Sequence, residues 1–114
     1  MGEHYLDEED ALKRLGGNKG LYLKLLKSFL GDGSFGNLQQ ALADGDQEKA
    51  KMAAHTLKGL AANLSLTVLS SEAAKVDGML KESLISLQEL GALEDARRKT
   101  VSAIEERIAA GSGM

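Results

Sequence analysis

One short segment of the sequence holds residue types that can carry out chemistry: AAHTLKGLAANL, from Ala53 to Leu64. His55 is followed three residues later by Lys58 and four residues later by Gly59. A neutral imidazole has a free nitrogen lone pair near pH 7 and can act as a nucleophile. An ammonium one helical turn away would stabilise the oxygens of a phosphoryl group, so phosphorus is the most natural electrophile for this histidine.

The sequence lacks the other parts of a phosphoryl-transfer site. It has no glycine-rich phosphate loop of the Walker or kinase type and no group of carboxylates spaced to hold magnesium. A metal site at His55 lacks a second ligand, because Lys51 and Gly59 occupy the positions four residues before and after it. A hydrolase would need a serine or water and an orienting carboxylate on the same face, and that set is missing. We therefore expect no metal and no cofactor in this chain, and expect a partner to supply the metal and acidic residues.

The apolar periodicity around His55 predicts that its side chain points away from the core. At about 100° per residue, the apolar side chains gather on the opposite side of the helix. They are Ala50, Ala53, Leu57, Leu60 and Leu64. The residues on the same face as His55 are Glu48, Lys51, Met52, Lys58, Gly59 and Ala62.

Gly59 is the unusual member of the His55 face. Glycine inside a helix costs about 1 kcal/mol relative to alanine, so either the helix ends there or space is needed near His55. The apolar pattern continues in phase through Leu60, Ala61 and Leu64, which argues against a helix end. Bare backbone would let the loops of another macromolecule approach the imidazole closely. The structural alternative is that His55 is an ordinary solvated histidine. This alternative explains why His55 is exposed but not why a glycine occupies position 59.

Composition favours a single all-α domain over residues 1–114. The chain contains no proline and no cysteine, and 43% of its residues are hydrophobic. Helix interiors exclude proline most strongly, and a chain without cysteine fits a reducing, cytoplasmic setting. The net charge is −3 with both signs interspersed, so no basic stripe is available for nucleic acid. No apolar run approaches the roughly 18 residues of a membrane span.

Polar caps and glycine turns divide the chain into six expected helices. Short connections place consecutive helices antiparallel, which predicts an up-and-down antiparallel four-helix bundle with a short additional N-terminal helix or helices. The first short helix is expected to act as a lid on one end, and the tail from Ala109 to fray. The helices are expected to begin at these caps or first residues: Asp7, Asn18, Ser34 or Phe35, Gln47, Ser65 and Ser86, the last with Glu89 as a capping box.

The stretch AHTLKGLAANL, from Ala54 to Leu64, resembles the signature around the phosphorylated histidine of histidine-containing phosphotransfer (Hpt) domains. Two further stretches also read like helices and turns of that family: ALKRLGGNKGLYLKLLKSFL at 11–30 and LQQALADGDQEKAKMAAHTLKG at 38–59. The resemblance covers most of the chain and is weakest after Leu80. At Ser65 many members have glycine, followed by a small residue where this chain has Leu66, so we expect a local difference in that turn.

The resemblance implies a phosphorelay intermediate. His55 would accept a phosphoryl group from an aspartyl phosphate of one receiver domain and pass it to an aspartate of another. Lys58 would stabilise the phosphorylated ring, and Gly59 would provide clearance. The implied partners are response-regulator receiver domains, a hybrid sensor histidine kinase, or both, with no nucleic acid and no membrane insertion. We expect a cytoplasmic monomer, either free or as the cytoplasmic domain of a membrane-bound sensor kinase.

Four residues of the His55 face are expected to contact the partner. Met52 suits a docking surface that accepts more than one partner, although a half-buried methionine at the edge of the core fits the sequence equally well. The set is Glu48, Lys51, Met52 and Ala62.

Other readings of the sequence stay open. One is an Hpt domain of the chemotaxis-kinase type, phosphorylated by an ATP-binding kinase domain, and the other is a purely structural helical bundle with an inert His55. His4, before the first helix, has no comparable surroundings. The basic run at 97–99 is interpreted as a solvated helix face, and contact with an acidic partner is the alternative.

Overall fold

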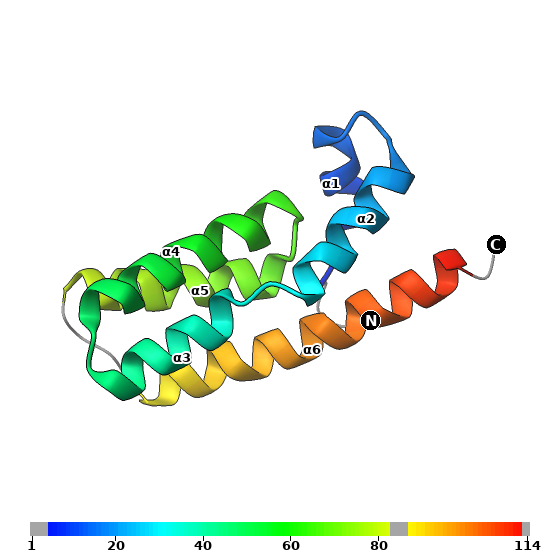
Figure 1. Cartoon of the computed structure of the whole chain (residues 1–114). Coiled ribbons are helices and arrows are strands. Elements are labelled where there is room, and N and C mark those ends of the chain that lie inside the picture. The colour runs from blue at the N-terminus through cyan, green and yellow to red at the C-terminus, as the bar shows by residue number, and fades with distance from the viewer. Residues whose placement is uncertain (1–4, 83–86, 113–114) are drawn as a thin grey trace.

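The structure, a computed structural model, describes residues 5–82 and 87–112. This part of the chain consists of α-helices joined by short turns, without a strand (Figure 1). The helices are α1 (Glu8–Arg14), α2 (Lys19–Leu30), α3 (Ser34–Asp44), α4 (Gln47–Asn63), α5 (Thr67–Lys81) and α6 (Leu87–Ser112). The expected all-α fold is confirmed.

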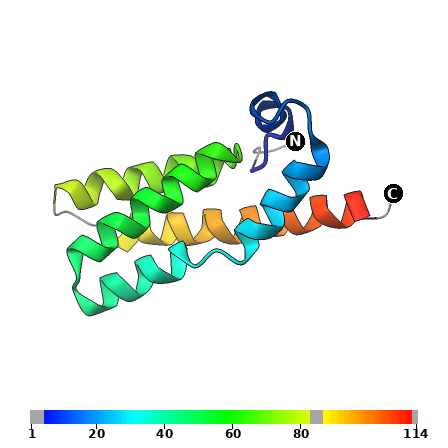
Figure 2. The same cartoon turned by 45° about the horizontal axis from the view of Figure 1, so that its top comes forward.

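Helices α3 to α6 form an antiparallel bundle in which each helix runs opposite to the one before it (Figures 1 and 2). The turn between α3 and α4 is tight because Gly45 adopts a φ of 73°, the left-handed region that glycine enters without a steric penalty. The guanidinium of Arg97 on α6 lies 5.0 Å from the ring centroid of Phe35 on α3, so the first and last helices of the bundle are in contact. This arrangement agrees with the up-and-down topology that the short connections predict.

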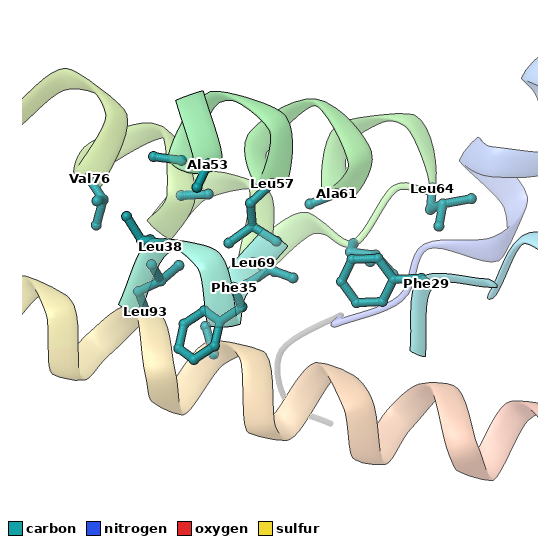
Figure 3. Close-up of a cluster of buried hydrophobic side chains, with 14 of the residues drawn as sticks. Phe29, Phe35, Leu38, Ala53, Leu57, Ala61, Leu64, Leu69, Val76 and Leu93 are labelled. Carbon is teal, nitrogen blue, oxygen red and sulfur yellow. The ribbon is translucent and has the colours of Figure 1, made fainter. Parts of the chain in front are cut away.

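Alanine dominates the side of α4 that faces the core. Ala50, Ala54 and Ala61 are completely buried, and Leu57 is the one large side chain that α4 buries completely. Figure 3 shows Ala53, Leu57 and Ala61 directed toward the apolar side chains of the neighbouring helices. Because small side chains let helices approach closely, α4 is held firmly along one side while its opposite side stays free.

The N-terminal helices cover one end of the bundle. The sequence predicts this position for the first short helix, whereas in the structure both α1 and α2 lie there. Helix α6 is 26 residues long and extends past the other bundle helices, and α2 packs against this extension (Figure 1). Glu8 of α1 accepts hydrogen bonds from Arg107 of α6 at 2.6 and 2.9 Å. The predicted caps Asp7 and Asn18 are confirmed, since each side chain accepts a backbone N–H of its helix.

Ser65 does not cap α5, and that prediction is wrong. Helix α5 begins at Thr67 after Leu66, and no side chain caps it. Ser65 instead adopts a φ of 56°, a conformation that costs a non-glycine residue about 1–2 kcal/mol. Its hydroxyl donates a hydrogen bond of 2.6 Å to Oδ2 of Asp10 on α1. Glycine would adopt this backbone freely, whereas the serine is held there by its bond to α1.

The C-terminal helix corrects two smaller expectations. Helix α6 continues through Ala109 to Ser112, so fraying from Ala109 is not observed in the described residues. Arg97 is partly buried over Phe35, so the basic run is not wholly a solvated face. The expected cap at Ser86 and the residue His4 lie outside the described residues. Within residues 5–82 and 87–112, no helix is both long and apolar enough to cross a membrane.

Candidate functional site

His55 lies near the middle of α4 on the face turned away from the core. Its side chain is exposed, whereas the neighbouring Ala54 and Leu57 are completely buried. Asp46 starts the helix by accepting the backbone N–H of Lys49 at 3.1 Å, and the helix then continues to Asn63. The reading in which the helix ends at Gly59 is therefore wrong.

Gly59 is exposed, and no atom of the described chain fills the space where its side chain would be. A Cβ built at this position meets nothing within 4 Å. Alanine would fit here and would favour the helix by about 1 kcal/mol. Internal packing therefore gives no reason for the glycine, which lies on the outer surface one turn after His55.

Lys58 is bonded to the neighbouring helix. Its Nζ lies 3.1 Å from Oδ2 of Asp77 on α5, a residue that is only 3% exposed. Lys81, one turn further along α5, places its Nζ 3.4 Å from the same oxygen. Burial alone would raise the pKa of Asp77, but the hydrogen bonds from Lys58 and Lys81 outweigh burial and hold that pKa below its ordinary value. Two ammonium groups thus share one buried carboxylate, which leaves a net positive charge beside the face that carries His55.

Sequence reasoning missed both Asp77 and Lys81. The available signal was the phase of α5, since position 77 follows Ala73 by four residues and Val76 by one. That phase places Asp77 on the apolar stripe, and a carboxylate there requires a cation or hydrogen-bond donors. Lys58 is the partner of Asp77 because of the way α4 and α5 are aligned, and the sequence alone does not give this alignment.

The four expected docking residues lie on the surface of α4, with different degrees of exposure. Glu48 and Ala62 are exposed, and Lys51 is partly buried and pairs with Glu48 at 3.7 Å. Met52 is 70% exposed, so the reading of a half-buried methionine at the core edge is wrong.

A groove of about 390 Å³ runs between α3 and α4, next to the histidine. Its lining is mixed, with polar side chains from both helices and the thioether of Met52. The lining includes Asn37, Gln40 and Asp44 of α3 and Lys49, Met52 and Thr56 of α4. His55 itself does not line the groove, but Met52 and Thr56, three residues before and one residue after it in α4, do.

The described residues contain no group of three or more histidine, cysteine, aspartate or glutamate side chains that could hold a metal ion. Asp77, the buried carboxylate that Lys58 contacts, is already paired with two lysines. The arrangement offers a nucleophile that is open to solvent, a cation one turn away and free space above the following turn.

Comparison with protein families matches residues 25–110 to the Hpt domain. The chain belongs to the Hpt domain family. The matched segment contains His55, Lys58, Gly59 and Asp77, while α1 and the first part of α2 precede it. Comparison with curated proteins and with solved structures gave no match. Hpt domains are phosphotransfer carriers of two-component systems that work with receiver domains and kinases, so the resemblance seen in the sequence is confirmed at the level of the family.

Proposed function

We propose that this Hpt domain carries phosphoryl groups on His55 as an intermediate of a phosphorelay. It takes the group from an aspartyl phosphate of one receiver domain and passes it to an aspartate of another. One observation carries this proposal: His55 is exposed in the middle of α4, and Gly59, one turn later, leaves space that no internal contact requires. Gly36, Gly78 and Gly91 also lie in helices and meet nothing within 4 Å of an added Cβ, so it is the place of Gly59 one turn after the exposed His55 that supports the proposal.

The transfer is a substitution at phosphorus. The lone pair of the unprotonated imidazole nitrogen of His55 attacks the phosphorus atom, while the other ring nitrogen keeps its proton. The bond between phosphorus and the aspartate oxygen breaks, and its electron pair leaves with the carboxylate. The reverse sequence delivers the group to the second receiver. We infer that the receiver supplies the magnesium ion and the acidic residues, and that this chain supplies the nucleophile and a cation.

Lys58 is the cation that would stabilise the phosphoryl oxygens. Residues three apart on a helix have Cβ atoms about 5–6 Å from each other, so the ammonium of Lys58 can reach a group carried by His55. In the unphosphorylated chain this ammonium is bonded to Asp77 of α5.

The receiver would dock over the exposed side of α4, with Gly59 and Ala62 allowing close approach after His55 and Met52 providing an apolar contact before it. Met52 is a flexible side chain at the edge of the α3–α4 groove, which suits a surface that must accept a donor and an acceptor in turn. Glu48 and Lys51 lie at the start of the same face and would contribute polar contacts.

The proposal is tested with receiver domains encoded in the same genome, each loaded with labelled acetyl phosphate in the presence of magnesium. We expect at least one receiver to transfer label to the wild-type chain as an acid-labile, alkali-stable phosphate. His55→Gln should receive none, while His4→Gln should be labelled like the wild type. Labelling that persists in His55→Gln, or no transfer from any receiver, would overturn the proposal. Transfer from an ATP-binding kinase domain alone would instead indicate the chemotaxis-kinase type.

A further inference from the structure

Asp77 presents a charge problem during phosphotransfer. Its carboxylate is 3% exposed and is bonded to Lys58 at 3.1 Å. If Lys58 turns toward a phosphoryl group on His55, this contact lengthens or breaks. A buried carboxylate that loses its partner is strongly destabilised, so the phosphorylated state would be penalised unless another cation remains.

A second cation is already in place. The Nζ of Lys81 lies 3.4 Å from the same oxygen of Asp77, four residues later on the same helix. Its side chain is 63% exposed, so the ammonium has room to move toward the carboxylate. Among the described residues, Lys58 and Lys81 are the cations within 4.0 Å of Asp77. The nearby Lys75 pairs with Glu72 at 3.4 Å instead.

We propose that Lys81 is a positioning residue: it keeps Asp77 neutralised and thereby frees Lys58 to bind the phosphoryl group on His55. This role rests on the proposed function of His55. Before phosphorylation, both lysines share the carboxylate. After phosphorylation, Lys81 holds Asp77 alone and Lys58 pairs with the phosphoryl oxygens, so every charge in the cluster keeps a partner of opposite sign.

The test uses the full chain and a small donor, so that no partner protein is needed. Potassium phosphoramidate transfers its phosphoryl group to histidine and releases ammonia, and ³¹P NMR reports the phosphohistidine formed. The measured quantity is the ratio of phosphorylated to unphosphorylated His55 at fixed concentrations of phosphoramidate and ammonia. We compare Lys81→Met with Lys75→Met, which removes an exposed lysine from the same helix.

Lys81→Met should lower this ratio about tenfold or more, because a hydrogen bond to a charged group is lost in the phosphorylated state. Lys75→Met should match the wild type, and Lys81→Arg should restore most of the ratio. The decisive variant adds Asp77→Asn to Lys81→Met. With no carboxylate to neutralise, the loss of Lys81 should then have no further effect relative to Asp77→Asn alone.

Two results would overturn the role of Lys81 while leaving the proposed function intact. One is a Lys81→Met ratio equal to that of Lys75→Met. The other is an effect of Lys81→Met that persists in the Asp77→Asn background. A general loss of stability or a direct contact of Lys81 with phosphate would produce that result, and the proposed role would not. A wild-type chain that forms no phosphohistidine at His55 would overturn both the proposed function and this inference.

Discussion

Replacing Gly59 by alanine should stabilise the free domain, whereas a larger side chain there should block phosphotransfer. Position 59 lies inside α4, is exposed, and offers open space to an added Cβ. The alanine variant should gain about 1 kcal/mol in the free energy of unfolding. For a domain of this size, that gain corresponds to a rise in melting temperature of about 4 °C.

Gly91 provides the matched control. It lies inside α6, is exposed, and has no atom within 4 Å of an added Cβ, as at Gly59. Gly91→Ala should therefore stabilise the domain by a similar amount. Thermal unfolding of both alanine variants measures the gain, and circular dichroism checks that Gly59→Gln and Gly91→Gln remain helical.

Phosphotransfer distinguishes the two glycines. Gly59→Gln places a side chain one turn from His55 on the surface that the receiver must approach, so transfer from a phosphorylated receiver should slow by about a hundredfold. Gly91→Gln should transfer at the wild-type rate. Lower stability of Gly59→Ala than of the wild type, or equal transfer rates for Gly59→Gln and Gly91→Gln, would refute this role of Gly59.

Two further predictions concern stability. A hydrogen bond to Glu72 raises the pKa of Glu89 above its ordinary value, so the protonated carboxyl group stabilises the folded state at low pH. This contribution to the free energy of unfolding is lost as the pH rises through the raised pKa. Glu89→Gln should therefore be more stable than the wild type at about pH 8 but not at about pH 4, as measured by urea unfolding, and equal differences at both pH values would contradict this. Arg14 donates to the carbonyl oxygens of residues 62–63 at the end of α4, so Arg14→Met should lower the free energy of unfolding by about 1 kcal/mol. Lys13→Met is its control, and equal melting temperatures for the two variants would count against the contact.

The exposure of His55 and the helical setting of Gly59 could be predicted because both depend on local signals. Periodicity within one helix determines which side chains face the core, and a pattern that stays in phase through Leu60 and Leu64 identifies a helix that does not end. The caps at Asp7 and Asn18 are equally local, since each side chain bonds a backbone N–H three residues away.

The long-range contacts between helices could not be predicted in the same way. Lys58 and Asp77 are 19 residues apart, and Arg14 contacts Ser65 across 51 residues. Such pairs depend on how the helices are aligned and spaced when they pack, and local sequence patterns do not determine that alignment. Ser65 illustrates the limit: its position before a helix suggests a cap, whereas the turn requires a positive φ and α1 takes up the hydroxyl.

Exchange of a phosphoryl group between His55 and receiver aspartates can be followed by ³¹P NMR of the chain mixed with a phosphorylated receiver. We expect the acyl-phosphate signal of the receiver to fall while a phosphohistidine signal rises, and we expect a second, unphosphorylated receiver to consume the new signal. The phosphohistidine signal should be absent with His55→Gln. A phosphohistidine signal that His55→Gln retains, or a wild-type chain that never gains one from any receiver of the same genome, would contradict phosphotransfer through His55.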